Sequence, residues 1–258
     1  MATLSSLLTA QANVLNALML RDIRTRMFGS SLGFIIVIVW PLSHILILVA
    51  IHSLLGHMAP YGSSTPLWVA TGTVPFMVFS YMSRFMMLSV VQNKPLLYFP
   101  VISVTDILFA RAIVEILSSS TVIMFVILIL ITVGVDVYPM ELSTVVTAVL
   151  VSALLGLGVG VLNGVIAAFV PAWVTGYTLL VILLWAASGI MFVPSHLPQQ
   201  VQTVLYFHPV LHTIEWVRSG YYDGYNSDIL DKWYPIIFGT CALMLGLVAE
   251  RVFRGKII

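Results

Sequence analysis

Residues Met27 to Ser83 read MFGSSLGFIIVIVWPLSHILILVAIHSLLGHMAPYGSSTPLWVATGTVPFMVFSYMS, a stretch without a single Lys, Arg, Asp or Glu. A transmembrane helix needs about 20 consecutive, mostly apolar residues, and a charge at the bilayer centre costs roughly 2.5–3.5 kcal/mol on insertion scales. This stretch is long enough to cross a bilayer twice with a turn between the crossings. It predicts that the chain is a membrane protein.

The composition of the whole chain also favours a membrane domain. Hydrophobic residues make up 60% of the 258 residues and charged residues only 8%. Apolar runs recur along the full length and leave no polar block as large as a soluble domain, so we expect a single membrane domain over 1–258. The formal net charge of +1 provides no field that would attract nucleic acid. Cys241 is the only cysteine, which excludes an intramolecular disulfide.

Turn residues divide the chain into six predicted spans. Gly, Pro and Ser gather at 60–66 and 134–139, where the chain is expected to reverse, and Pro171 helps to end the fourth span. The fold class predicted is therefore all-α, with six transmembrane helices. The predicted spans are Leu32 to Ser53, Leu67 to Val91, Ile107 to Val133, Leu142 to Val170, Val174 to Val193, and Trp233 to Val252.

The distribution of positive charges predicts the orientation of these spans. Loops rich in Lys and Arg stay on the cytoplasmic side of a membrane. If both termini are cytoplasmic, Arg218 and Lys232 are the only two of the eleven Lys and Arg residues on the outer side. The opposite orientation would move the other nine outward, so we expect both termini in the cytoplasm.

A segment before the first span does not fit a plain six-helix bundle. In residues 1–28, leucines recur near one helical face, and polar residues occupy the others. Three arginines, Arg21, Arg24 and Arg26, follow at the end of this segment. The pattern predicts a helix that lies in the membrane interface.

A second unusual segment, residues 194–232, precedes the last span. It contains apolar turns, but Pro198 and Pro209 divide it into pieces that are too short to cross a bilayer. The pattern predicts two short re-entrant helices, which are tolerated at membrane depth only where protein or a water-filled cavity satisfies the backbone. An amphipathic loop resting on the outer surface is the alternative.

Two intrahelical charge pairs are predicted from their spacing. Arg111 and Glu115 are four residues apart near the inner end of the third span, so a helix would place them together as an ion pair. Structural bracing is favoured over substrate contact for this pair. Glu215 and Arg218 are three apart and would share a face of the second short helix, where pairing would offset the cost of burying either charge.

Known catalytic and metal-binding motifs are missing from the sequence. There is no G-x-x-x-x-G-K-[ST] phosphate loop, so any energy from ATP would have to come from another subunit. There is no H-E-x-x-H, and His208 and His212 are four apart without a convincing third ligand. We therefore expect no bound metal and no cofactor on this chain.

An intramembrane serine hydrolase is the enzyme alternative. Ser188 precedes Gly189 in the fifth predicted span, and a nucleophile there would need a histidine base such as His44 or His52. A Ser-Gly pair in a membrane helix is more often a packing contact between helices. We therefore expect no catalytic site.

Short motifs spread over the chain carry a resemblance to a known family. They are Ala17-Leu18-Met19-Leu20-Arg21-Asp22-Ile23-Arg24-Thr25-Arg26, then Leu32-Gly33-Phe34 and Pro41, Val74-Pro75-Phe76, Ala110-Arg111-Ala112 with Glu115, and His208-Pro209-Val210-Leu211-His212 leading to Glu215 and Arg218. From end to end, the chain resembles the ABC-2 type permeases that export polysaccharide, and most closely the membrane subunit of capsular polysaccharide exporters.

This resemblance implies a homodimer in the bacterial inner membrane, each subunit bound to a cytoplasmic ATPase subunit that holds ATP and Mg. The complex would move a lipid-linked polysaccharide outward, together with a periplasmic polysaccharide co-polymerase and an outer-membrane export protein. An exporter of O-antigen or of teichoic acid is a sibling alternative.

The resemblance also implies roles for particular residues. The first and fifth spans would line a conduit, although a membrane-interface belt is the alternative for its aromatic rings. The conduit candidates are Phe34, Trp40, His44, Tyr177, Trp185 and Phe192. A cytoplasmic coupling loop over 92–106 would dock on the ATPase through Asn93, Lys94, Tyr98 and Phe99. The outer gate would include Pro198, Pro209, Glu215 and Arg218.

Overall fold

The computed structural model describes residues 4–26, 32–54 and 58–257, and this part of the chain contains helices and no strand. The all-α class predicted from the sequence is confirmed for these residues. In chain order the elements are α1 (Leu4–Arg26), α2 (Leu32–Leu54), α3 (Thr65–Gln92), the 3-10 helix η1 (Lys94–Tyr98), α4 (Val104–Thr132), α5 (Leu142–Phe169), α6 (Trp173–Ala186), the 3-10 helix η2 (Pro194–His196), α7 (Gln199–Leu205), α8 (Pro209–Tyr221) and α9 (Trp233–Ile257).

Four helices are long and apolar enough to cross a membrane, judged by length and composition among the described residues. They are Thr65–Gln92, Val104–Thr132, Leu142–Phe169 and Trp233–Gly255. Two further apolar helices are shorter, Ile38–Leu54 within α2 and Trp173–Ala186. The helical membrane architecture therefore agrees with the sequence, whereas six complete crossings stay a prediction.

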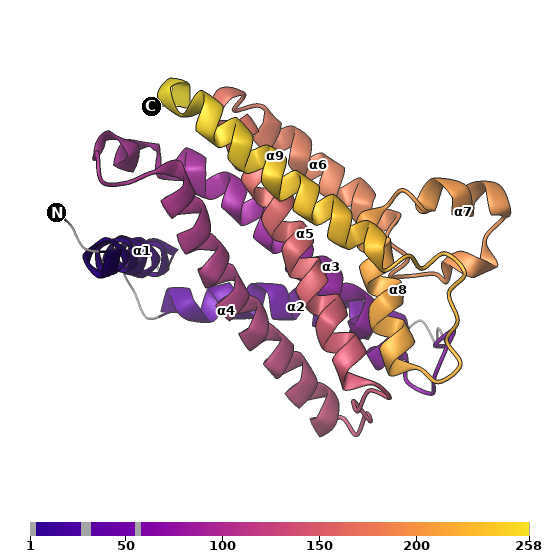
Figure 1. Ribbon diagram of the computed structural model, residues 1–258. Coiled ribbons are helices and arrows are strands. Elements are labelled where there is room, and N and C mark those ends of the chain that lie inside the picture. Colours follow the sequence, from indigo (N-terminus) through magenta and orange to yellow (C-terminus); the bar gives the residue numbers. More distant parts are fainter. Residues whose placement is uncertain (1–3, 27–31, 55–57, 258) are drawn as a thin grey trace.

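α5 lies between α3 and α9 and packs along both of these helices (Figure 1). Glycines allow the backbones of these helices to approach closely. A methyl group added at Gly158 of α5 would lie 2.2 Å from the carbonyl oxygen of Gly239 in α9. No real side chain tolerates that distance, so the α5–α9 contact depends on the absence of a side chain at Gly158.

α1 lies across one end of the bundle. It is seen nearly end-on in Figure 1, whereas the long helices run across the picture. Asp22 of α1 accepts a hydrogen bond of 2.6 Å from Arg111 of α4. Gln11, further back on α1, donates to Asp106 in the first turn of α4. Two polar contacts therefore fasten α1 to α4, while its placement in a membrane interface stays a prediction.

The fifth span is shorter than predicted. The sequence suggests a helix from Val174 to Val193, but α6 ends at Ala186. Gly189 has a φ of +80°, a left-handed conformation that favours glycine and that a helix does not contain. The Ser188 hydroxyl donates to the carbonyl of Trp185 at 2.7 Å, at the end of its own helix. The Ser188 hydroxyl is therefore bonded to the backbone of its own segment, which agrees with a structural role for this residue.

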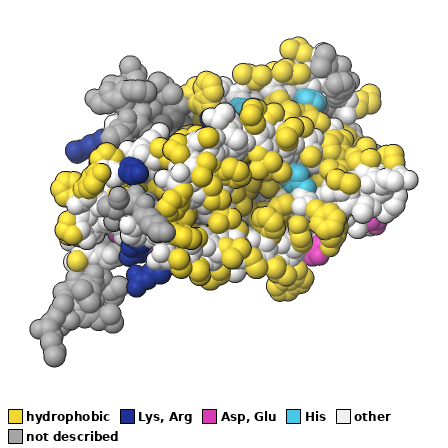
Figure 2. Space-filling model, turned by 90° about the horizontal axis from the view of Figure 1, so that it is seen from above, with side chains coloured by type: hydrophobic (Ala, Val, Ile, Leu, Met, Phe, Trp, Pro, Cys, Tyr) yellow, Lys and Arg dark blue, Asp and Glu magenta, His cyan; other side chains and the backbone are white. Residues whose placement is uncertain are grey.

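Charged side chains gather at the two ends of the molecule. Figure 2 shows Lys and Arg at the left end, and Figure 1 places α1 and the C-terminus at that end. Acidic side chains are visible at the opposite end, where α7 and α8 lie. The surface between the two ends is largely hydrophobic. On the face shown, two ends of different charge thus flank a largely apolar surface.

Substituting Gly158 by Ala tests the close α5–α9 contact. We expect a loss of about 1–3 kcal/mol in stability, because the helices must separate to admit the methyl group. The control is Gly176→Ala in α6, where an added Cβ has no neighbouring atom within 4 Å. Thermal unfolding of the purified protein in detergent should show a lower midpoint for Gly158→Ala alone; equal midpoints for both variants would contradict the packing argument.

Candidate functional site

The α8 segment is held inside the protein. α8 begins at Pro209, and the Nδ1 atom of His208 accepts a hydrogen bond of 3.1 Å from the backbone N–H of Leu211. This contact caps the helix and satisfies one of its free amide groups. Val210, Leu211 and Ile214 are fully buried. The second short helix is thus packed into the bundle as an internal element.

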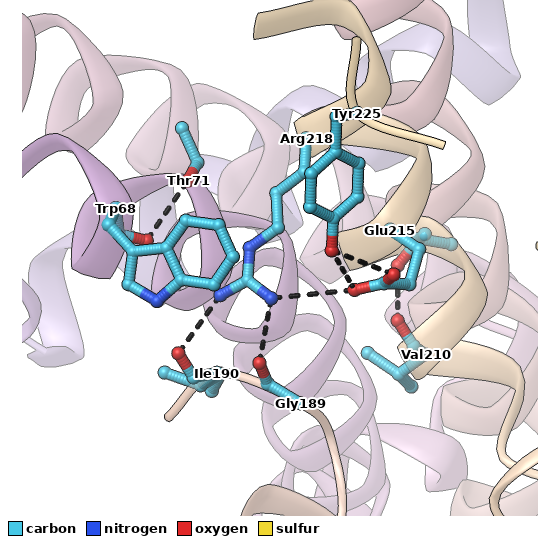
Figure 3. Close-up of polar contacts among 9 residues, drawn as sticks. Trp68, Thr71, Gly189, Ile190, Val210, Glu215, Arg218 and Tyr225 are labelled. Carbon is cyan, nitrogen blue, oxygen red and sulfur yellow. Dashed lines mark hydrogen bonds and ion pairs between the residues drawn. The ribbon is translucent and has the colours of Figure 1, made fainter. Parts of the chain in front are cut away.

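Arg218 lies at the centre of a buried polar network on α8 (Figure 3). Its side chain has no exposed surface. The two terminal nitrogens donate to the carbonyl oxygens of Gly189 and Ile190 at 2.8 and 2.9 Å. Its guanidinium carbon lies 3.6 Å from the centre of the Trp68 ring, a cation–π contact with α3. Arg218 therefore ties α8 to the chain after α6 and to α3.

Glu215 supplies the balancing negative charge. One carboxylate oxygen lies 3.4 Å from an Arg218 nitrogen, and this side chain is also fully buried. The hydroxyl of Tyr225 donates to the same carboxylate, with distances of 3.0 and 2.8 Å to its two oxygens. A buried ion pair is tolerated when additional hydrogen bonds satisfy both partners. Tyr225 bonds to the carboxylate and the two carbonyl groups bond to the terminal nitrogens of Arg218, whereas the Arg218 Nε has no hydrogen-bond partner among the described residues.

His208 and His212 connect the same segment to its neighbours. Nε2 of His208 contacts the carbonyl of Leu184 at 2.8 Å, and Nε2 of His212 contacts the carbonyl of Tyr206 at 2.7 Å. Nδ1 of His212 accepts from the backbone N–H of Asp231 at 3.1 Å. In each ring both nitrogens thus bond to the backbone, with Nδ1 accepting and Nε2 donating. These histidines act as structural links between α6, α8 and the start of α9.

A second buried arginine lies near the other end of the bundle. Arg111 of α4 bonds to Asp22 at 2.6 Å and lies 3.0 Å from Glu115, one turn further along α4. Its guanidinium carbon lies 4.9 Å from the centre of the Phe85 ring of α3. The arrangement joins α1, α3 and α4, and its geometry is that of a structural brace.

The conduit candidates do not share one surface in this subunit. Tyr177 is buried against α3, where its hydroxyl donates to Ser83 at 2.7 Å. Trp40 on α2 is 69% exposed, and His44 is exposed as well. Trp185 and Phe192 are half-buried, and Phe192 lies beyond the end of α6. The side chain of Phe34 lies outside the described residues.

The predicted coupling loop follows α3 and contains η1. Asn93 ends α3 and accepts a hydrogen bond of 2.6 Å from Arg21 of α1. Lys94 is exposed, and the rings of Tyr98 and Phe99 are 75% and 60% exposed. The loop therefore presents two aromatic rings to the surroundings beside α1.

The arginines of α1 are only partly described. Arg21 and Arg24 are exposed, whereas the side chain of Arg26 lies outside the described residues. Arg21 bonds to Asn93, so at least one of the three arginines contacts the loop after α3. Pro198 and Pro209 lie where each short helix begins, immediately before α7 and as the first residue of α8.

Several partners in these networks could not be found from the sequence. Trp68 contacts Arg218 across 150 residues of chain, and the Gly189 and Ile190 carbonyls carry no side-chain signal at all. Asp22 stands in the Arg-Asp motif near the N-terminus, but nothing in the sequence pairs it with Arg111. The spacing of residues along a helix predicts partners within that helix but not partners on another helix.

The sequence of this chain matches a known protein family. The family model described as ABC-2 type transporter matches residues 13–222, and the chain belongs to this family of membrane transport proteins. The match includes α2 to α8, and so includes Arg111, Arg218 and the exposed loop after α3. The prediction of a transport subunit, as opposed to an intramembrane hydrolase, is confirmed.

Individual relatives are similar over nearly their whole length. The chain is 30% identical over 244 residues to the polysialic acid transport protein KpsM of Escherichia coli, which covers 93% of both chains. It is 26% identical to the capsule polysaccharide export inner-membrane protein CtrC of Neisseria meningitidis serogroup A, over 96% of this chain and 94% of that protein. It is 25% identical to the capsule polysaccharide export inner-membrane protein BexB of Haemophilus influenzae, over 97% and 95%.

Single and double substitutions of Glu215 and Arg218 test the outer network. Glu215→Ala or Arg218→Ala leaves the other charge buried without its partner, and we expect each to cost about 3–5 kcal/mol. The double variant removes both charges and should lose less than the sum of the two single losses. Thermal unfolding midpoints measure this difference, and strictly additive losses would contradict the pairing.

Proposed function

We propose that this chain is the transmembrane subunit of an ATP-driven exporter that moves lipid-linked capsular polysaccharide across the bacterial inner membrane. The main support is the similarity to three named transport or export proteins over at least 93% of this chain, two of them named for capsule polysaccharide export from the inner membrane. Family membership supports transport driven by a separate ATPase, since the sequence carries no phosphate loop.

The active complex is proposed to be a homodimer with two copies of a cytoplasmic ATPase subunit that bind ATP and Mg. A periplasmic polysaccharide co-polymerase and an outer-membrane export protein complete the route of the polymer. Both termini face the cytoplasm, because the end of the molecule that holds α1 and the C-terminus also carries the Lys and Arg side chains.

The exposed loop after α3 is proposed to transmit the ATPase cycle. Tyr98 and Phe99 offer exposed aromatic rings, which are common anchors in protein interfaces. The bond between Arg21 and Asn93 connects this loop to α1. A movement of the ATPase would therefore act on α1 and on the end of α3 together.

The α7–α8 segment is proposed to form the outer gate as a re-entrant pair of short helices. α7 and α8 contain 7 and 13 residues, lengths of about 10 and 20 Å that are too short to cross a bilayer. In the state described here, Arg218 holds α8 against the chain after α6. Opening the gate would require those two carbonyl contacts to be exchanged for others.

Loss of capsule is the direct test of the proposed function. Deletion of the gene should abolish surface capsule, leave polymer inside the cell, and leave O-antigen and teichoic acid unchanged. Complementation with the wild-type gene should restore capsule. Normal capsule in the deletion strain, or a loss of O-antigen or teichoic acid in its place, would overturn the assignment.

Substitution of Tyr98 and Phe99 by Ala tests the coupling role. The double variant should weaken binding of the ATPase subunit by about tenfold or more, as expected for aromatic anchors of an interface. The control is Tyr138→Ala, which removes a ring that is 85% exposed in the α4–α5 connection. Co-purification and export are the measurements; normal values for both in the double variant would contradict the role.

Cysteine labelling tests the outer position of α7. Cys241 is the only cysteine and is exposed, so it is first replaced by Ser. Val204→Cys, at a position 72% exposed, should react with a membrane-impermeant maleimide added outside intact spheroplasts. Val101→Cys, at a position 69% exposed beside η1, should not react. The reverse pattern would contradict the proposed orientation. A labelling rate of Val204→Cys that is the same with and without ongoing export would contradict the gate.

A further inference from the structure

A cavity of about 230 Å³ lies between α2, α3 and α4. Most of its lining is apolar, and the exceptions include Glu115 and two serines of α4. Trp40 on its wall is 69% exposed, so the cavity reaches the surface of the bundle beside α2. The helices that surround it are apolar and belong to the membrane domain. An acyl chain is a molecule that fits such an apolar lining.

The far side of the cavity is closed. Ile45, Met77 and Val122 line it and are also members of one buried cluster that packs α2, α3 and α4 together. Ile45 is 1% exposed and Val122 is 6% exposed. An acyl chain can therefore enter the cavity but cannot pass through it toward the α8 segment. This geometry fits a resident membrane lipid better than a lipid that carries a polymer through the protein.

An arginine beside the cavity has no polar partner among the described residues. Arg84 of α3 is exposed, and the described residues offer it no ion pair or side-chain hydrogen bond. It follows Tyr81 by three residues and precedes Phe85, and both of these aromatic residues line the cavity. Residues three apart on a helix lie near the same face, so Arg84 lies close to the side of α3 that lines the cavity.

The other charges near the cavity are already paired. Glu115 lies 3.0 Å from Arg111, which also bonds to Asp22. These three residues carry one positive and two negative charges, so they provide no binding site for an anion. Among the described residues near the cavity, Arg84 is the cation available to an anion, and an arginine binds a phosphate through charge-assisted hydrogen bonds.

The depth of Arg84 fits a headgroup at the inner surface. It lies eight residues before Gln92, the last residue of α3, which is about 12 Å along the helix axis. A long arginine side chain at this depth can extend its charged end toward the interface while its stem lies on apolar surface. The phosphate of an inner-leaflet lipid is the anion at that level.

We propose that this cavity binds one acyl chain of an inner-leaflet anionic phospholipid, whose phosphate is held by Arg84. The lipid fills the space between α2 and the α3–α4 pair and acts as part of the packing of each subunit. The inference of the leaflet rests on the proposed cytoplasmic position of both termini. The cavity and its lipid do not depend on which polymer is exported.

Lipid retention by the complete complex tests this site. The complex is purified from membranes, reconstituted in vesicles of phosphatidylethanolamine and phosphatidylglycerol, returned to detergent, and analysed by native mass spectrometry. The wild type should keep one phospholipid more per subunit than Ser119→Phe, in which the ring occupies the cavity. The control Ser120→Phe, at the next and exposed position of α4, should keep the wild-type number.

Arg84→Gln tests the headgroup contact separately. This variant should retain lipid but lose the preference for phosphatidylglycerol over phosphatidylethanolamine, whereas the control Arg251→Gln, at an exposed arginine of α9, should keep it. Equal lipid numbers in the wild type and Ser119→Phe, or an unchanged preference in Arg84→Gln, would overturn the proposal.

A photoreactive phosphatidylglycerol covers the case in which Ser119→Phe does not fold. With its diazirine on the acyl chain, this lipid should label wild-type peptides that contain residues 74–85 and 115–123. Labelling confined to other helices, or displacement of the probe by the exported glycolipid, would overturn the proposal. Capsule production is measured in the same strains, so a failure of the exporter assignment is recorded separately from a failure of the lipid site.

Discussion

The burial of a full positive charge on Arg218 sets conditions that the surrounding structure has to meet. An unpaired charge in this position would be strongly destabilising, so the guanidinium needs acceptors from several directions. α6 has to stop early, because the carbonyls of Gly189 and Ile190 are only available outside a helix. Glu215 neutralises the charge from within α8, and Trp68 covers one face of the guanidinium from α3.

A buried arginine that contacts an aromatic ring of α3 and a glutamate of its own helix occurs twice in the subunit. Near its start, Trp68 lies against Arg218, and near its end, Phe85 lies against Arg111. Each arginine also has a glutamate on its own helix within one turn, at 3.4 Å and 3.0 Å. α3 therefore connects a charge site beside the proposed coupling loop with another beside the proposed outer gate, which gives the two ends a shared structural element.

Features of the fold and of the site could be predicted where neighbouring residues in the sequence determine them. The uncharged runs locate the helices well, and the predicted second, third and fourth spans match α3, α4 and α5 to within a few residues. The end of α6 could not be predicted, because residues 187–193 are mostly apolar like the helix before them, and Arg218, which binds the carbonyl groups of this segment, is distant in the sequence. Tyr177 is a conduit candidate because the resemblance assigns the fifth span to a conduit, and no local signal predicts that its hydroxyl bonds to Ser83 inside the subunit.

The contact between Gly158 and Gly239 has a consequence for movement in the transport cycle. Two backbones that touch without side chains between them have no rotamers to adjust, so α5 and α9 are expected to move as one rigid body. α6 is attached through side-chain hydrogen bonds, such as that of Trp173 with Asn163, which can exchange partners. We therefore expect the hinge of this subunit where α6 attaches, with the α5–α9 pair as the fixed frame.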